Sequence, residues 1–236
     1  HGASGAENSF LVDGVPTNSL IDGRARGNTV FEYLQEVQVK TSGINAEYGG
    51  ALGGVISAVT KSGGNTFNGE AHYYYIGNKL SASPIERIQL SPVDNATVFH
   101  VQDTKPKDNR TELGGSLGGP IVRDKLFFFT SISPRLVRRT NNYLFSNGLE
   151  PGAIDQNQTL HQAFGKVTYA NSRLTASGSM LATPTRSTGV LPAYRGTGTN
   201  FTTSSLAQND PFKTQGYKSD QYNATGDVNI ALTSSS

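Results

Sequence analysis

The sequence predicts a mainly β protein in which an N-terminal region precedes about six antiparallel strands of a transmembrane β-barrel. Three observations support this prediction. From residue 66 onward, apolar or small residues alternate with polar ones, as in strands with two different faces. The connections between these stretches are alternately long and very short. No apolar run approaches the ~18 residues of a transmembrane helix, so any membrane span must consist of strands.

Six stretches carry the two-residue period. They are residues 67–76, 111–121, 126–133, 162–169, 174–182 and 222–232. In the last of them, even positions from Tyr222 to Leu232 are apolar or small, whereas odd positions are polar up to Asn229. We expect the apolar row of each strand to face lipid and the polar row to face a lumen.

The connections distinguish a barrel from a soluble β-sandwich, whose strands also alternate. Long polar connections alternate with tight turns, and aromatic residues cluster near the turns, as in the interfacial girdle of an outer-membrane barrel. The long connections are residues 77–108, 138–158 and 184–217, and the short ones are 122–124 and 170–172. Because the smallest membrane barrels have about eight strands, six strands cannot close one, and we interpret the chain as a piece of a longer protein.

Composition excludes several classes of protein. Hydrophobic residues make up 35% of the 236 positions and charged residues 16%, which is typical of neither a compact soluble core nor a charged disordered chain. The net charge of +2 gives no reason to expect a nucleic-acid partner. The absence of cysteine excludes disulfides and thiolate metal sites.

The stretch Glu47–Ser62 separates the two parts of the chain. Its four closely spaced glycines allow a near approach of backbone to another surface. An apolar strand, Val55–Thr60, follows, and Lys61–Asn65 has the composition of a turn. Upstream, we predict a strand over Phe10–Val15, a short helix over Val30–Glu36 and a strand over 37–41.

Three motifs resemble the plug domain of TonB-dependent outer-membrane receptors. YGGALGGVISAVTKSG at 48–63 is similar to the end of that domain, Asp13-Gly-Val-Pro16 to its "DGVP" turn, and Leu34–Lys40 to its "IERVEV" segment. Members of the family often have Arg-Gly-Pro where this chain has Thr41-Ser-Gly43. Together with the run Gly118–Phe129, this departure resembles the Oar-like branch. The resemblance covers residues 7–137 well.

The resemblance implies residues 1–65 as the C-terminal part of a plug and 66–236 as the first strands of a large barrel with long extracellular loops. It implies a receptor that imports an extracellular solute with energy from a TonB-type coupling protein. Loop residues expected to face the vestibule are Asp22, Arg24 and Arg26. Residues expected to pack or tether the plug are Tyr48, Gly49, Gly50, Gly53, Gly54, Lys61 and Gly63.

Two alternatives remain open: an outer-membrane surface protein that is structural or linked to secretion and does not import, and a soluble β-sandwich binding module. We expect no enzyme and no cofactor, because Ser116 lies within an expected strand and not at the strand-to-helix turn of a nucleophile elbow. The four histidines lack metal-ligand spacing, and His72 is expected to be a polar residue of the lumen. Outer-membrane lipid and lipopolysaccharide are expected partners, the latter at a basic cluster, Arg135, Arg138 and Arg139.

Overall fold

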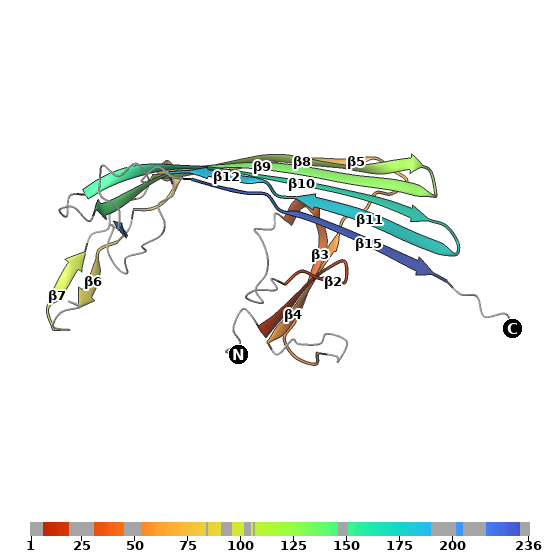
Figure 1. Ribbon diagram of the computed structural model, residues 1–236, viewed down its shortest axis with the longest axis horizontal. Coiled ribbons are helices and arrows are strands. Elements are labelled where there is room, and N and C mark those ends of the chain that lie inside the picture. Colours follow the sequence, from red (N-terminus) through yellow and green to blue (C-terminus); the bar gives the residue numbers. More distant parts are fainter. Residues whose placement is uncertain are drawn as a thin grey trace.

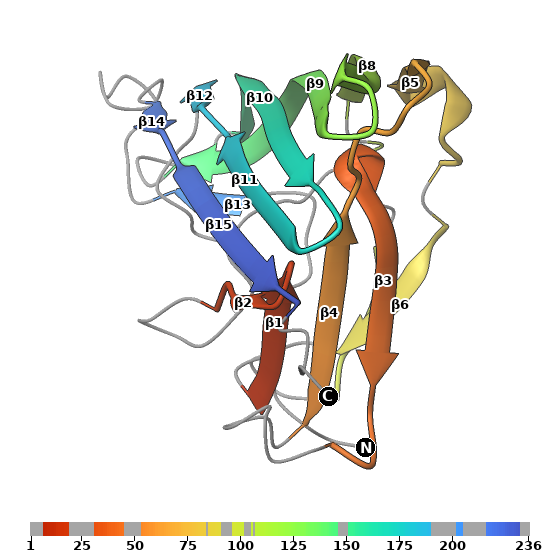
Figure 2. The ribbon, with the colours of Figure 1, turned by 90° about the vertical axis from the view of Figure 1, so that its right-hand side faces the viewer.

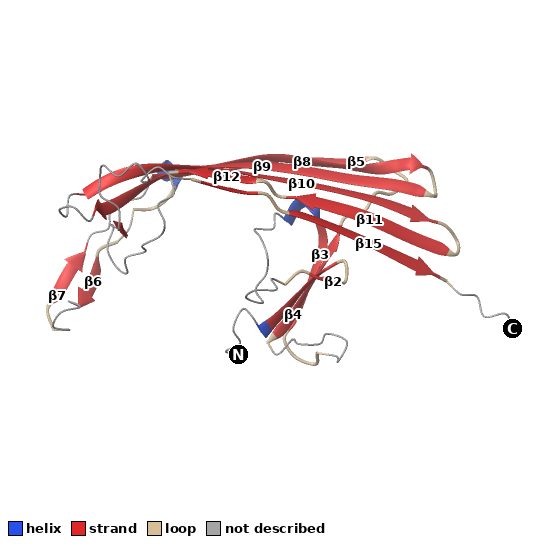
Figure 3. Cartoon of the chain, in the orientation of Figure 1, coloured by secondary structure: helices blue, strands red, loops and turns tan. Residues whose placement is uncertain are grey.

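The computed structural model describes residues 7–18, 31–44, 53–83, 85–90, 96–101, 105, 107–145, 151–189, 202–204 and 216–231. These residues form two main sheets (Figures 1 and 3). One is a long, gently curved sheet, and the other is a small sheet that extends away from one of its faces (Figure 2). Within the described residues, no helix combines the length and hydrophobicity of a membrane span.

The small sheet, called here the N-terminal sheet, has the strand order β2-β1-β4-β3. Its strands are β1 (Asn8–Val12), β2 (Val15–Pro16), β3 (Leu34–Lys40) and β4 (Gly54–Thr60). Strand β4 is central, parallel to β1 and antiparallel to β3. That position fits its apolar composition, because Val55 and Ala58 are buried.

A two-residue turn joins β1 to β2. Val12 pairs with Val15, so Asp13 and Gly14 form the loop. Both have positive φ, 48° and 79°, which is the conformation of a type I′ hairpin and favours the sequence Asp-Gly. The turn points the Asp13 carboxylate at β4, where the Thr60 amide donates to it at 2.8 Å.

The long sheet contains six principal strands, each antiparallel to the next along the chain. They are β5 (Asn68–Ile76), β8 (Lys107–Val122), β9 (Leu126–Phe145), β10 (Pro151–Ala170), β11 (Leu174–Ala182) and β15 (Tyr222–Ile230). Short strands extend this sheet at one end: β12 (Thr185–Thr188), β13 (Thr202–Ser204) and β14 (Tyr217–Ser219). A separate hairpin, β6 (Arg87–Leu90) and β7 (Val98–Val101), lies near the same end (Figure 1), and two 3₁₀ turns are η2 (Phe31–Tyr33) and η3 (Asn78–Leu80).

The two faces of the long sheet are opposite in character to those of a soluble sandwich. The face that carries the N-terminal sheet, called the inner face, buries polar side chains: Glu112, Ser131, Ser133, Gln162 and Lys166. The outer face leaves an apolar row exposed: Leu113, Leu117, Ile132, Leu136, Val167, Met180, Val228 and Ile230. A soluble protein would bury the second set and expose the first. The predicted apolar row is therefore confirmed as an exposed face of the sheet, and its contact with lipid stays a prediction.

The long connections 77–108 and 184–217 contain short strands, and two further sequence predictions were wrong in detail. The expected helix over Val30–Glu36 is one 3₁₀ turn followed by β3, which begins at Leu34. A register shift between Leu34 and Glu36 adds one residue to the strand, so apolar residues fall three apart as on a helix. The expected loop over residues 138–158 is mostly the continuation of β9 and β10. Polar residues follow one another in the sequence there, so no alternation marks the strands, although the backbone ladder continues.

Candidate functional site

A buried ion pair joins the two sheets. The Nζ atom of Lys166, on the inner face of β10, lies 3.1 Å from Asp13 Oδ2 and 2.9 Å from Thr60 Oγ1. The Thr60 hydroxyl in turn donates to Asp13 Oδ2 at 2.5 Å. Only 9% of the Lys166 side chain and 13% of the Asp13 side chain are exposed. The end of β4 and the β1–β2 turn are therefore fixed to one strand of the long sheet.

The surroundings of Asp13 keep it charged. Burial by itself would raise the pKa of this carboxyl, but hydrogen bonds from the side chain and backbone of Thr60 and the ammonium of Lys166 outweigh that effect. The pKa therefore lies below its ordinary value of 3.8. At neutral pH the contact is an ion pair with its polar atoms satisfied.

An aromatic cluster lies beside this ion pair. The ring of Tyr33, from η2, stacks on Phe164 of β10 with centroids 4.7 Å apart. Phe129 of β9 meets Phe164 at 6.1 Å, and Leu34 and Leu181 pack against the cluster. Aromatic pairs of this kind contribute about 0.5–1.5 kcal/mol beyond their buried area. The cluster gives the two sheets an apolar contact beside the ion pair.

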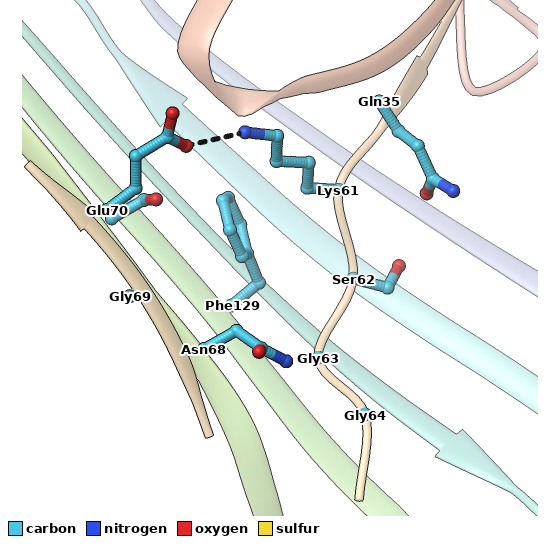
Figure 4. A pocket seen from close by; sticks show the side chains of 11 residues that line it. Gln35, Lys61, Ser62, Gly63, Gly64, Asn68, Gly69, Glu70 and Phe129 are labelled. Atoms are coloured by element: carbon cyan, nitrogen blue, oxygen red, sulfur yellow. Dashed lines mark hydrogen bonds and ion pairs between the residues drawn. The ribbon is translucent and has the colours of Figure 1, made fainter. Parts of the chain in front are cut away.

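The segment from Lys61 to Phe67 connects the sheets and lines a pocket against β5, β8 and β9 (Figure 4). Lys61 Nζ donates to Glu70 Oε2 of β5 at 3.1 Å, the contact drawn in Figure 4. Further along, Asn65 makes two hydrogen bonds to Asp124, in the β8–β9 turn, at 2.7 and 2.8 Å. Both ends of the segment are thus attached to the long sheet.

Gly63 lies against the backbone of β8 and β9. A Cβ at this residue would lie 2.2 Å from the carbonyl oxygen of Phe128 and 2.8 Å from that of Gly119, both of them backbone atoms. At neighbouring Gly64 nothing lies within 4 Å of such an atom. Gly63 therefore has a steric reason to be glycine, and Gly64 has no comparable one.

This difference gives a matched test. Gly63→Ala is expected to displace the connecting segment and to destabilise the protein by about 1–3 kcal/mol, the usual cost of overpacking. Gly64→Ala is expected to change stability by less than about 0.5 kcal/mol. Urea denaturation of the two purified full-length variants measures both values. Equal stability of the two variants would show that the segment does not need the close approach.

Several residues expected to be functional lie outside the described residues: Asp22, Arg24, Arg26, Tyr48, Gly49 and Gly50. Gly53 and Gly54 are described, and both lie within the N-terminal part of the chain. The amide of Gly53 donates to the Glu7 carbonyl, and a Cβ at Gly54 would meet Lys40 and Asn8 of the N-terminal sheet.

The predicted basic cluster is divided between the two faces of β9. Arg135 and Arg139 belong to the inner face, where they pair with Glu112 at 2.6 Å and Asp108 at 2.7 Å, whereas Arg138 is exposed on the outer row. The alternation of strand side chains, which separates neighbouring arginines, explains this correction. Ser116 lies in the middle of β8, so the geometry of a nucleophile elbow is absent there.

Sequence reasoning missed the partners Asp13 and Lys166. Each sat in a predicted element, the turn after β1 and the polar row of β10, but they are 153 positions apart and no local pattern relates them. The available signal was a lysine in the middle of a strand, because a charge at that depth requires a partner.

Comparisons with known proteins agree with this geometry. Residues 59–234 match the family model described as "Outer membrane beta barrel domain". The chain belongs to this family. Its long sheet is therefore part of an outer-membrane barrel, and the protein resides in the bacterial outer membrane.

One curated relative of this barrel protein is a TonB-dependent transporter. Over 138 residues the chain is 35% identical to the TonB-dependent transporter Oar of Myxococcus xanthus, an alignment that includes 58% of this chain and 12% of that protein. The predicted resemblance to the Oar-like branch is confirmed. The chain thus spans about an eighth of the length of the curated relative that it matches.

Solved structures share the fold. The outer-membrane transporter YddB from Escherichia coli superposes with a TM-score of 0.69 at 17% identity, over 98% of this chain and 30% of that one. The siderophore receptor PirA from Acinetobacter baumannii superposes with a TM-score of 0.53 at 18% identity, over 94% of this chain and 30% of that one. At these identities the two structures support the fold alone.

Proposed function

We propose that this chain belongs to a receptor that binds an extracellular solute and imports it with energy from a TonB-type inner-membrane coupling protein. Residues 1–65 act as the C-terminal part of a plug. Residues 66–236 supply the first strands of the barrel wall, and the long sheet is the described part of this wall. The relationship to the Oar transporter supports the class of protein. The solute and the coupling step are inferred for the whole protein, of which the chain is a part.

The observation that carries the proposal is the contact between the N-terminal sheet and the inner face of the long sheet. The sheet meets the inner face of the wall through the Asp13–Lys166 ion pair and a small aromatic cluster. Lys166 and buried Gln162 are polar members of the inner row of β10, with Phe164 of the aromatic cluster between them. Polar side chains can be rehydrated, so the N-terminal sheet can leave the inner face and expose only this small cluster to water. An immobile structural domain would gain more from an apolar contact.

The connecting segment fits the same function. Gly63 lies against the wall, and Asn65 is hydrogen-bonded to the β8–β9 turn. We infer that Lys61–Asn65 stays attached when β4 moves, so the plug remains tethered. Tyr48, Gly49, Gly50, Gly53 and Gly54 are proposed as packing residues of the plug, and Asp22, Arg24 and Arg26 as residues of the vestibule. Arg138 remains the member of the basic cluster that can reach lipopolysaccharide phosphates.

Cysteine labelling tests the import step, since this chain has no cysteine. Thr60 is 1% exposed and lies between Asp13 and Lys166. A Thr60→Cys variant of the full-length protein, in a background free of other cysteines, is expected to resist a water-soluble maleimide in cells that lack the coupling protein. In energised cells that contain the coupling protein, we expect labelling to increase. Equal labelling in both strains would favour the alternative of a surface protein without import.

A further inference from the structure

Three side chains that commonly bind metals meet where η2 touches the wall. Glu32 comes from η2, His72 from β5 and Glu112 from β8. The Nε2 atom of His72 lies 3.9 Å from Oε1 of Glu32 and 3.9 Å from Oε1 of Glu112. All three ligand atoms lie within 4.8 Å of one another. The group therefore includes one ligand from the N-terminal part of the chain and two from the barrel wall.

The wall positions its two ligands through register. His72 pairs with Gly114 on β8, and its ring occupies the space above that glycine, where a Cβ would come within 2.3 Å of Nε2. Glu112 lies two residues along β8 on the same face. Arg135 donates to Glu112 Oε2 at 2.6 Å and so leaves Oε1 directed at the histidine. This is the arrangement in which an outer partner orients a metal ligand.

The distances favour a bridging ion over direct hydrogen bonds. A separation of 3.9 Å is too long for a hydrogen bond. Two ligands at about 2.1 Å from a tetrahedral ion are about 3.4 Å apart, so small side-chain movements would complete the site. The nearest polar atom to Nε2 given by the structure, Ser133 Oγ at 3.4 Å, makes at most a weak contact.

A buried orphan oxygen is the independent sign of a missing partner. Glu32 Oε2 is buried and makes no hydrogen bond to any described residue. The side chains of Glu32, His72 and Glu112 are only 16%, 9% and 8% exposed. Two buried carboxylates, of which one has Arg135 as a partner, leave a negative charge for which burial is costly. A cation between the three ligands would offset that charge, and bidentate binding by Glu32 would also give Oε2 a partner.

We propose that Glu32, His72 and Glu112 bind one divalent cation of the Zn²⁺ class, which links the N-terminal sheet to the wall. An imidazole nitrogen with two carboxylates suits Zn²⁺ and its transition-metal neighbours better than Mg²⁺ or Ca²⁺, which prefer oxygen ligands. The ion connects the two parts of the protein, because the bond to its ligand from η2 must break before the N-terminal sheet can leave the wall. This inference rests on the ligand geometry and holds whether or not the protein imports a solute.

Zinc titration of the full-length protein tests the proposal. Purified protein in detergent is stripped with a chelator, dialysed and titrated with ZnCl₂ against a fluorescent competitor. Wild type is expected to bind one more Zn²⁺ than His72→Gln or Glu32→Gln, or to bind it at least ~100-fold more tightly. His100→Gln is the matched control, because exposed His100 pairs with Glu86 at 2.9 Å in the β6–β7 region. This control should bind zinc as wild type does.

Hydrogen exchange keeps the test informative if a substitution disturbs folding. Zn²⁺ is expected to slow amide exchange in η2 and β3 of wild type at least ~10-fold, and to leave exchange in Glu32→Gln unchanged. Glu32→Gln keeps the size of the side chain and removes only its charge. Equal zinc stoichiometry and affinity in wild type and both variants would overturn the proposal. Protection that depends on pH in zinc-free buffer, with no response to Zn²⁺, would also overturn it.

Discussion

Lys166→Met is expected to destabilise the contact between the N-terminal sheet and the long sheet by about 3–5 kcal/mol, because it leaves the Asp13 carboxylate buried without its cation. In the full-length protein this loss should lower the urea concentration at which β1 and β4 become sensitive to protease by more than about 1 M. The barrel wall should keep its own unfolding midpoint, since methionine preserves most of the volume of the lysine stem. An unchanged midpoint for the N-terminal sheet would show that the ion pair contributes little to this contact.

The double variant Asp13→Asn, Lys166→Met is the control for this substitution. Removal of both charges should recover part of the loss, since no uncompensated ion stays buried.

The stability that Asp13 contributes depends on pH in a definite direction. Because the folded-state pKa of Asp13 is lowered, its contribution is fully present above the ordinary value of 3.8 and disappears as pH falls through the lower folded value. The greater stability of wild type relative to Asp13→Asn should therefore disappear only in strong acid.

Val228→Arg is expected to cost about 2–4 kcal/mol of barrel stability if its site lies near the bilayer midplane. Val228 belongs to the outer row of β15 and is 65% exposed on a face that we assign to lipid. Thr225 belongs to the inner row, where its hydroxyl lies 2.6 Å from that of Ser179. Thr225→Arg should therefore cost much less, because an arginine there reaches water. The assembled fraction of each full-length variant is measured from the heat-dependent mobility of the folded barrel in gels.

A reversed order of the two variants would contradict the orientation of β15. Single cysteines at the same positions provide a milder measurement. A cysteine at Val228 should resist a water-soluble thiol reagent, and one at Asp227 should react more readily. Uniform reactivity along the strand would exclude a lipid-facing row.

The strands and their faces could be predicted because the two sides of a barrel wall meet different solvents. Lipid selects apolar residues and the lumen selects polar ones, so the two-residue period stays visible wherever a strand crosses the membrane. The rows through Leu113 and Val228 follow that rule, and both lie on the outer face. Beyond the membrane both faces meet water. The rule gives no signal where polar residues follow one another, as at the ends of β9 and β10, and the sequence therefore predicts a loop there.

The contacts between the sheets could not be predicted for a different reason. Glu32, His72 and Glu112 come from three elements, and only the seating of η2 against the wall brings them together. Sequence spacing detects metal ligands that share one helix or loop, so the histidines gave no signal. The need for Gly63 was likewise invisible, because the carbonyl of Phe128 that excludes a side chain belongs to β9.

The most direct test of the central claim is whether the N-terminal sheet closes a pore. A full-length variant that lacks residues 7–60 loses all four strands of that sheet and keeps the wall from Lys61 onward. If the sheet is a plug, cells with this variant should become sensitive to vancomycin, which is too large for ordinary porins, while the barrel still assembles in the outer membrane. Wild-type resistance in cells that contain the assembled variant would contradict the claim.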